Sequence, residues 1–286
     1  MGSKKVLSGQ AALVTGGGGG IGGASAKWLA RDGAAVMIMG RTESTLVDTR
    51  KAILEELGPE AIVEYFVGDA LEPQTVHAAL DATAKLGDRL GIAVSVVGGG
   101  TMKPLLMFSD TEVLEELRIN IVSAFLVIKH ATPLMVQGGG GSIVCISSDA
   151  AKIPWPFLTF YNTAKHGVEG LVKGAAIELG NLNVRVNAVR PGLVNTNMTQ
   201  TKGLFADEEA IKLFIAEKPL GRTGVPDDIG AGVRYLAGPE SSWVTGQSIG
   251  IEGGNELTKA PYLESVARKR LRDDAAVDEA LAGRIP

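Results

Sequence analysis

A phenol and an ammonium group lie four residues apart in the segment Tyr161-Asn162-Thr163-Ala164-Lys165, a spacing that puts both on one face of a helix. The phenol of a free tyrosine, with a pKa near ~10, keeps its proton at neutral pH and is a poor base. An ammonium group ~4 Å away, at an effective dielectric of ~20, contributes roughly 4 kcal/mol, which limits the decrease of that pKa to about three pKa units. We therefore expect Lys165 to lower the pKa of Tyr161, so that the pair exchanges protons with a substrate oxygen in both directions. The alternative is an ordinary surface pair on a helix.

A cluster of glycines follows the short apolar run at residues 11–14, and a helical pattern begins within it. The segment reads Thr15-Gly16-Gly17-Gly18-Gly19-Gly20-Ile21-Gly22. A strand, a tight glycine turn and a helix N-terminus form the site that a dinucleotide pyrophosphate requires. In it Gly16 permits the turn, Gly20 lets a phosphate approach the backbone, and Gly22 lets the helix pack close to the strand. A flexible linker is the alternative, and the buried elements expected on both flanks argue against it.

Elements that can position these groups alternate along the chain, because short apolar runs predict strands and amphipathic runs with glycine or proline boundaries predict helices. The expected strands cover residues 11–14, 36–39, 62–67, 92–97, 142–147, 184–189 and 247–251. The expected helices cover residues 21–32, 42–57, 73–86, 109–135, 159–179, a segment from 226 onward, and weaker patterns at 263–271 and 275–281. This alternation predicts an α/β fold with a doubly wound (Rossmann) seven-stranded parallel sheet and helices on both faces, in a single domain. Ligands of such sheets bind at the carboxyl ends of the strands.

The composition is that of a compact chain, with 38 glycines among 286 residues as its one outlier. A hydrophobic content of 45% excludes disorder, and the glycines follow no three-residue period, which excludes collagen. A formal net charge of -4 provides no basic surface for nucleic acid or for an anionic membrane. The single Cys145 and three dispersed histidines offer no disulfide and no metal site, and no apolar run approaches the ~18 residues of a transmembrane helix. We expect a cytoplasmic protein that binds no nucleic acid, membrane or metal.

The glycine turn, which reads T-G-x-x-x-G-x-G, and the later Y-x-x-x-K pair resemble the motifs of the short-chain dehydrogenase/reductase family. Two further residues stand where the family has its catalytic serine and its helix asparagine: Ser148, thirteen residues before Tyr161, and Asn120. The resemblance covers about residues 8–255 and implies hydride transfer between a nicotinamide dinucleotide and a carbonyl or secondary alcohol. It implies that Tyr161 is the general acid and base and that Ser148 bonds the substrate oxygen. Lys165 would also hold the nicotinamide ribose, and Asn120 would fix a water beside it.

The same resemblance implies where the cofactor lies. Asp69 and Ala70 match the family's contact to the adenine, and residues 98–100 are glycines where the family has N-N-A-G. Because no asparagine is present there, we expect the cofactor contacts of that turn to be backbone contacts. The implied cofactor-binding residues are Thr15, Gly16, Gly18, Gly19, Gly20, Ile21, Gly22, Arg41, Asp69, Ala70, Gly98, Gly99, Tyr161, Lys165, Pro191, Gly192, Val194 and Thr196.

The residue at the end of the second strand distinguishes the two nicotinamide cofactors. A carboxylate there accepts hydrogen bonds from the adenosine ribose and repels a 2′-phosphate. Gly40-Arg41 stands there instead, and a guanidinium binds a phosphate through two parallel bonds, which favours NADP. Gly19 occupies the place where many NADP-using relatives have a second basic residue, so NAD stays open as the cofactor.

Apolar residues favour a lipophilic small-molecule substrate, such as a steroid, a terpenoid or an acyl thioester. They lie in the loop after Ser148 and in an expected substrate lid at about residues 195–222, although packing in the core or between subunits explains them equally well. Two other functions stay open. One is an enoyl- or dienoyl-CoA-type double-bond reductase, whose members in the family typically change the Ser/Tyr arrangement. The other is a non-catalytic dinucleotide-binding regulator, which the loss of Tyr161 or Lys165 would have indicated.

We expect residues 1–255 to form the catalytic domain and residues 256–286 a C-terminal extension. The family resemblance implies a homotetramer or homodimer built on the helices at 109–135 and 159–180 and on the last strand. The extension is longer than the family minimum, and we expect it to pack over the substrate cleft of a neighbouring subunit.

Overall fold

Seven parallel strands form one sheet in the order β3-β2-β1-β4-β5-β6-β7, so the switch in strand order falls between β1 and β4. The computed structural model describes residues 5–196, 208–216, 218–258 and 263–285. The strands are β1 (Gln10–Thr15), β2 (Ala35–Gly40), β3 (Val63–Val67), β4 (Arg89–Ser95), β5 (Gly141–Ile146), β6 (Val184–Pro191) and β7 (Ser248–Ile251). The doubly wound parallel sheet that the sequence predicts is confirmed.

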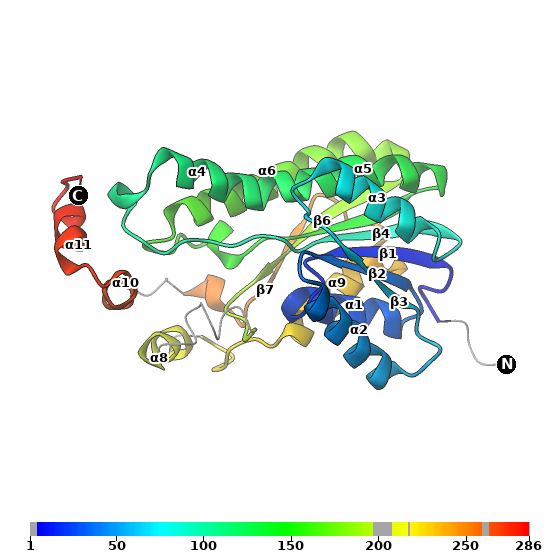
Figure 1. Ribbon diagram of the computed structural model, residues 1–286, viewed down its shortest axis with the longest axis horizontal. Coiled ribbons are helices and arrows are strands. Elements are labelled where there is room, and N and C mark those ends of the chain that lie inside the picture. The colour runs from blue at the N-terminus through cyan, green and yellow to red at the C-terminus, as the bar shows by residue number, and fades with distance from the viewer. Residues whose placement is uncertain (1–4, 197–207, 217, 259–262, 286) are drawn as a thin grey trace.

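Helices cover both faces of the sheet (Figure 1). One face carries α3 (Pro73–Ala84), α4 (Asp110–Leu117), α5 (Ser123–Gln137) and α6 (Thr159–Leu179), and the other carries α1 (Gly20–Arg31), α2 (Glu43–Leu57) and α9 (Pro226–Ala237). At the end of the molecule away from the N-terminus lie α8 (Glu208–Ala216), α10 (Glu264–Leu271) and α11 (Asp274–Leu281). Short 3₁₀ turns are η1 (Leu105–Met107), η3 (Asp149–Ala151), η4 (Gly180–Leu182), η6 (Pro239–Ser241) and η7 (Asn255–Leu257).

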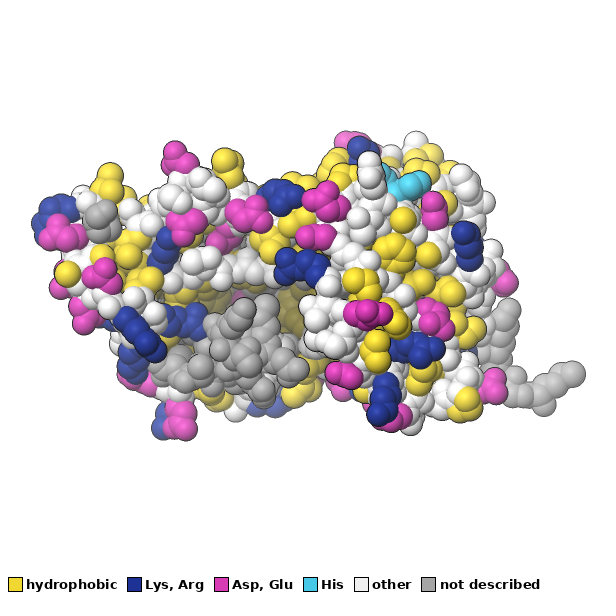
Figure 2. Space-filling model, viewed as in Figure 1, with side chains coloured by type: hydrophobic (Ala, Val, Ile, Leu, Met, Phe, Trp, Pro, Cys, Tyr) yellow, Lys and Arg dark blue, Asp and Glu magenta, His cyan; other side chains and the backbone are white. Residues whose placement is uncertain are grey.

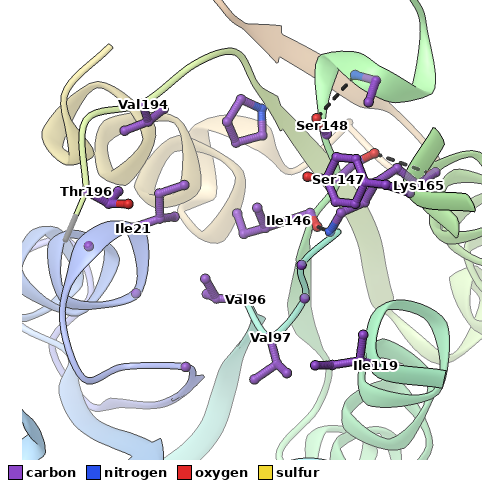
Figure 3. A pocket seen from close by; sticks show the side chains of 18 of the residues that line it. Ile21, Val96, Val97, Ile119, Ile146, Ser147, Ser148, Lys165, Val194 and Thr196 are labelled. Atoms are coloured by element: carbon purple, nitrogen blue, oxygen red, sulfur yellow. Dashed lines mark hydrogen bonds between the residues drawn. The ribbon is translucent and has the colours of Figure 1, made fainter. Parts of the chain in front are cut away.

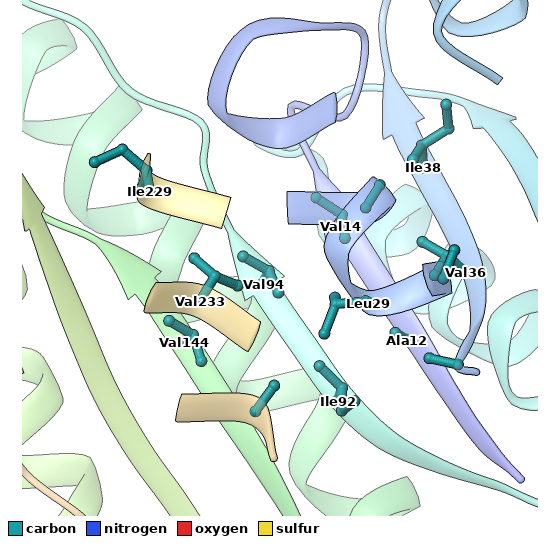
Figure 4. Packing of buried hydrophobic residues seen from close by; sticks show 14 of the residues in the cluster. Ala12, Val14, Leu29, Val36, Ile38, Ile92, Val94, Val144, Ile229 and Val233 are labelled. Carbon is teal, nitrogen blue, oxygen red and sulfur yellow. The ribbon is translucent and has the colours of Figure 1, made fainter. Parts of the chain in front are cut away.

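Each face of the sheet has its own apolar core, because successive side chains of a strand point to opposite faces. Figure 4 shows Leu29 of α1 and Val233 of α9 packed against strand residues such as Val14 and Val94. On the opposite face, strand residues including Leu13 pack against α3, α5 and α6. The strands are therefore apolar on both sides, as a parallel sheet between two helical layers requires.

The long helix expected at residues 109–135 contains a π-turn. It begins with the expected capping box of Ser109 and Glu112, but the π-turn η2 (Arg118–Val122) separates α4 from α5. The fourth strand also differs from the expectation, because β4 ends at Ser95 and residues 96–97 leave the sheet. The π-turn and the early end of β4 both lie at the carboxyl end of β4, which borders the switch in strand order.

Residues 110–137 form one helical stretch that by length and composition could cross a membrane, although no such segment was expected from the sequence. This is weak evidence, because the core helix of a globular domain passes the same test. Val127, Ala131 and Met135 of this stretch are fully buried against the sheet, so its apolar side belongs to the core.

We expect Gly22→Ala to destabilise the fold, because a Cβ at residue 22 would lie 2.1 Å from the carbonyl oxygen of Gly16. Overpacking against backbone lowers the free energy of unfolding by about 1–3 kcal/mol. The matched control is Gly174→Ala, at an exposed position of α6 with no atom within 4 Å of the added Cβ. That change should be neutral or raise the stability by about 0.5–1 kcal/mol. Chemical denaturation measures the free energy of unfolding of both variants, and an equal decrease in the two would contradict the packing role of Gly22.

Candidate active site

The glycine turn after β1 leaves the N-terminus of α1 open to a ligand. Gly16, Gly19 and Gly20 have φ values of +66°, +118° and +54°, which residues with a side chain rarely adopt. Gly19 precedes α1 and provides no side-chain cap for its first backbone N–H groups. These N–H groups and the positive end of the helix dipole together suit a phosphate.

A cavity of about 520 Å³ lies beside this turn, along the carboxyl ends of the strands. In Figure 3, Ile21 and Thr196 lie on one side of it and Ser148 and Lys165 on the other, and Figure 2 shows a hollow in the middle of the face drawn. The predicted residues that line it are Gly16, Gly19, Gly20, Ile21, Gly22, Arg41, Asp69, Ala70, Gly98, Gly99, Ser148, Tyr161, Lys165, Pro191, Gly192, Val194 and Thr196. The fold therefore brings the glycine turn and the groups predicted to exchange protons into one cavity.

Thr15 and Gly18 were also predicted to contact the cofactor, but they lie outside this lining. Thr15 is fully buried, and its hydroxyl donates to the carbonyl of Val94 (3.4 Å) and accepts from the N–H of Val96 (3.3 Å). It therefore ties β1 to the end of β4. A Cβ at Gly18 would lie 2.6 Å from Thr45 Oγ1, so Gly18 is a packing position between the turn and α2.

Asn120 is likewise outside the lining, and its side chain bonds to the backbone of the turn after β4. Its Nδ2 donates to the carbonyls of Gly99 (2.8 Å) and Glu116 (2.8 Å), and its Oδ1 accepts from the N–H of Gly99 (3.2 Å). These contacts use both N–H groups of the amide, which leaves little of the side chain for the expected water. A Cβ at Gly98 would lie 2.5 Å from Asn120 Oδ1 and 2.9 Å from Lys165 Nζ, so a side chain at position 98 would have to displace one of these two groups.

Lys165 is buried and Tyr161 is half-buried, and their pKa values differ from the sequence-based expectation. Lys165 Nζ donates to the carbonyl of Ile146 (3.0 Å) and lies 5.5 Å from the centroid of the Tyr161 ring. Burial lowers the pKa of Lys165 to about 8 and raises the pKa of Tyr161 to about 12, against a hydrogen bond with Ser148 that lowers it. The expected decrease of the Tyr161 pKa is therefore wrong for this structure, because desolvation of the phenol dominates.

Apolar side chains close the cavity beyond Ser148. Trp155 stacks on Phe214 of α8 with ring centroids 4.5 Å apart, and both line the cavity. Leu263 and Val266, from the C-terminal extension, pack into the same buried cluster. Part of the extension thus packs beside Trp155 and Phe214 of its own chain, and its expected packing over a neighbouring subunit stays a prediction. Of the expected lid at residues 195–222, residues 197–207 and 217 lie outside the described residues.

Comparison with known proteins identifies the family. A family model described as enoyl-(acyl carrier protein) reductase matches residues 16–256. The L-rhamnose 1-dehydrogenase (NAD(P)(+)) of a Sphingomonas species is 35% identical over 254 residues, which cover 87% of this chain and 97% of that protein. The 7alpha-hydroxysteroid dehydrogenase of Clostridium sardiniense is 34% identical over 272 residues, which cover 92% of this chain and 100% of that protein. A solved short-chain type dehydrogenase/reductase from Mycobacterium ulcerans is 32% identical, with a TM-score of 0.88 over 96% of this chain and 98% of that one.

The chain belongs to the short-chain dehydrogenase/reductase family. It is therefore an oxidoreductase that uses a nicotinamide dinucleotide and acts on a small molecule. The cavity fits such a cofactor on geometric grounds, because Cβ atoms at Gly98 and Gly100 would clash with Asn120 and with the Tyr161 ring, which keeps the turn after β4 free of side chains. Asp69, which was predicted to contact the adenine, lines the cavity, and its Oδ1 accepts from the N–H of Leu71 (2.9 Å).

Several residues of the lining were not predicted from the sequence. Asp149 had a readable signal, because it is a carboxylate directly after Ser148 at the end of a strand. Val96 and Val97 were missed because the fourth strand was expected to continue through them. Ile119 lies in the π-turn, which no local sequence pattern indicated.

We expect Gly98→Ala to lower kcat/KM by ~100-fold, because the added Cβ must displace Asn120 or Lys165 and a misplacement of about 1 Å has an effect of this size. The matched control is Gly99→Ala, whose added Cβ has no atom within 4 Å and should cause a much smaller loss. Steady-state kinetics compares the two variants, and thermal unfolding checks that both are folded. Equal losses would show that the clash at position 98 does not shape the site.

Proposed function

We propose that the protein catalyses reversible hydride transfer between NADP(H) and a carbonyl or secondary alcohol of a lipophilic molecule, with Tyr161 as the general acid and base. The observation that carries the proposal is that Ser148, Tyr161 and Lys165 line the same cavity as the glycine turn of α1. The bound cofactor supplies the hydride in one direction and accepts it in the other.

In the proposed reduction, the O–H bond of Tyr161 breaks and its proton forms the O–H bond of the product alcohol. A pKa raised to about 12 keeps this proton on the phenol near neutral pH, which suits the acid role. Ser148 donates a hydrogen bond to the substrate oxygen as negative charge develops there. Lys165 holds the nicotinamide ribose hydroxyls, and Asn120 keeps the turn after β4 in place through its bonds to Gly99.

The walls beyond Ser148 support a lipophilic substrate. Trp155, Leu158, Leu193 and Phe214 line this part of the cavity, and burial of apolar surface is the interaction they offer. The relative named 7alpha-hydroxysteroid dehydrogenase agrees with this substrate class, and the relative named L-rhamnose 1-dehydrogenase makes a sugar the main competitor.

Carbon–carbon double-bond reduction is the second candidate, because the matching family model is described as an enoyl-(acyl carrier protein) reductase. The retained Ser148, Tyr161 and Lys165 favour carbonyl chemistry over it. The third candidate, a non-catalytic dinucleotide-binding regulator, has no observation in its favour.

Arg41 supports NADP as the cofactor. It is exposed, lines the cavity, and forms no ion pair with any residue that the structure describes. A guanidinium without a carboxylate partner is available for a 2′-phosphate.

A homotetramer or homodimer remains our proposal for the assembly. Trp243 and Ile177 support it, because these large apolar side chains are 99% and 84% exposed in the single chain and a subunit interface would bury them. We place the protein in the cytoplasm, where a buried free thiol such as Cys145 stays reduced.

Tyr161→Phe tests the function, because it removes the transferable proton and retains the ring. We expect kcat to fall about 10²- to 10⁴-fold while NADPH still binds, as followed by cofactor fluorescence. The assay is a panel of ketones, secondary alcohols, sugars and enoyl thioesters with both cofactors in both redox states. Tyr65→Phe, which removes a hydroxyl bonded to Glu43 at the surface, is the matched control and should keep its activity. Turnover of enoyl thioesters alone would replace the proposal with double-bond reduction, and cofactor binding without any turnover would favour the regulator.

Arg41→Ala tests the cofactor. Loss of a charge-assisted contact of about 1.5–3 kcal/mol should lower kcat/KM for NADPH about 10- to 100-fold and leave NADH unaffected. Lys51→Ala removes the same charge from the exposed side of α2 and should change neither value. An equal effect of Arg41→Ala on both cofactors would contradict the assignment.

A further inference from the structure

Asp149 is a buried carboxyl group in the wall of the cavity, and the proposed reaction gives it no role. It is 5% exposed and follows Ser148 directly, just beyond the end of β5. A carboxyl group in such a place must either be paired or hold its proton, so its neighbours decide its state.

Groups from three other segments converge on Asp149. Asn255 of η7 donates from Nδ2 to Oδ2 (2.7 Å), the Trp155 side chain bonds to it from the loop before α6, and the buried Lys218 adds a positive charge from the loop after α8. Oδ1 lies 3.1 Å from Ser148 Oγ. These contacts favour the ionised form, yet burial outweighs them and raises the pKa of Asp149 above its ordinary value. Asp149 therefore holds its proton at a higher pH than a free carboxyl group does.

The charged and titratable groups that face this carboxyl group come from two sides. Lys218 favours its ionised form, and Tyr161 of α6 faces it across Ser148. Glu252, after β7, acts on Lys218 and keeps part of that positive charge compensated. A change of charge at Lys218 should therefore change the pKa of Asp149.

Ser148 has one hydroxyl proton, which it can donate to Asp149, to the hydroxyl of Tyr161 or to a ligand in the cavity. Its Oγ accepts from the N–H of Ala150 (3.2 Å), and Asp149 Oδ1 lies within hydrogen-bond distance on another side. Beside an ionised Asp149 the hydroxyl must donate to the carboxylate, because a carboxylate can only accept. Beside a neutral Asp149 the acid O–H can donate to Ser148 Oγ, and the Ser148 proton is then free to point into the cavity.

We propose that Asp149 is a positioning residue that turns the Ser148 hydroxyl toward the substrate oxygen as a neutral acid and holds that hydroxyl away as a carboxylate. The inference rests on the proposed function, because it needs Ser148 to donate to the substrate oxygen. In the reduction, the proton that moves comes from Tyr161, and both Asp149 and Ser148 keep theirs. Reduction and oxidation share one transition state, so the neutral form of Asp149 favours both directions.

The test is the pH dependence of kcat/KM for a ketone and its alcohol. Ionisation of Asp149 should make kcat/KM fall as the pH rises, which adds a descending limb to the pH profile. In Asp149→Asn the amide oxygen accepts from Asn255 and the amide N–H donates to Ser148, as the neutral acid does. That variant should lose the limb, and one pH unit above the midpoint its kcat/KM should exceed that of the wild type about tenfold.

Lys218→Met is the second variant, because it removes the positive charge and keeps an unbranched apolar side chain beside Phe214. It should move the limb to higher pH, since the ionised form of Asp149 loses a favourable neighbour. Asp110→Asn, at the exposed N-terminus of α4, is the control and should leave the limb in place. The infrared carbonyl band of a neutral carboxylic acid provides a readout without turnover: it should be absent in Asp149→Asn and titrate with the midpoint of the limb.

A limb that survives in Asp149→Asn overturns the proposal, and so does an equal loss of kcat/KM at every pH or a limb that Lys218→Met leaves unmoved. Turnover that disappears in Tyr161→Phe establishes the proposed function independently of Asp149. If no carbonyl or alcohol substrate reacts at all, the proposed function fails, whereas an infrared band that titrates and shifts in Lys218→Met still shows the protonation of Asp149.

Discussion

The pair of hydrogen bonds between Asn120 and the backbone of Gly99 is the constraint on which the site depends. It fixes the π-turn η2 against the turn after β4, so that helix and strand meet without an intervening side chain. Gly98 must then lack a Cβ because Asn120 lies too close, and a Cβ at Gly100 would lie 2.7 Å from the Tyr161 ring. Gly98 and Gly100, two of the three glycines that replace the asparagine-containing turn of the family, therefore occupy positions where a side chain would clash, and Asn120 supplies the side-chain bonds that the turn lacks.

The sheet and the glycine turn could be predicted because their determinants are local. An apolar run before Gly16 and a helical pattern after Gly22 fix a strand, a turn and a helix within a few residues of each other. The π-turn could not be predicted, since it depends on the contact of Asn120 with Gly99, which is 21 residues away in the sequence. The same contact lies where β4 ends early, so two errors of the sequence analysis have one tertiary cause.

The substrate side of the cavity was less predictable for the same reason. The apolar residues around Trp155 and two weak helices in the C-terminal extension can be read from the sequence, but their distance in space cannot. The structure joins the two parts through Leu263 in a shared buried cluster. Asn255, the residue before the extension, adds a bond to Asp149, 106 residues away in the sequence. A marginally helical tail thereby packs behind Trp155 and Phe214, which line the cavity.

Burial of the phenol is the main reason why the pKa of Tyr161 is raised and not lowered, and two buried carboxyl groups add to that effect. Asp149 and Glu116 both raise the pKa of Tyr161 when they are charged, and burial raises the pKa of each of them as well. Glu116 accepts from the N–H of Thr101 (3.1 Å) through Oε2, while its Oε1 is buried without a hydrogen-bond partner among the described residues. A neutral carboxyl group exerts no such charge on the phenol. Protonation of Asp149 would therefore lower the pKa of Tyr161. It would also release the Ser148 hydroxyl from its bond to the carboxylate, so a single protonation would favour proton donation by both groups that face the substrate oxygen.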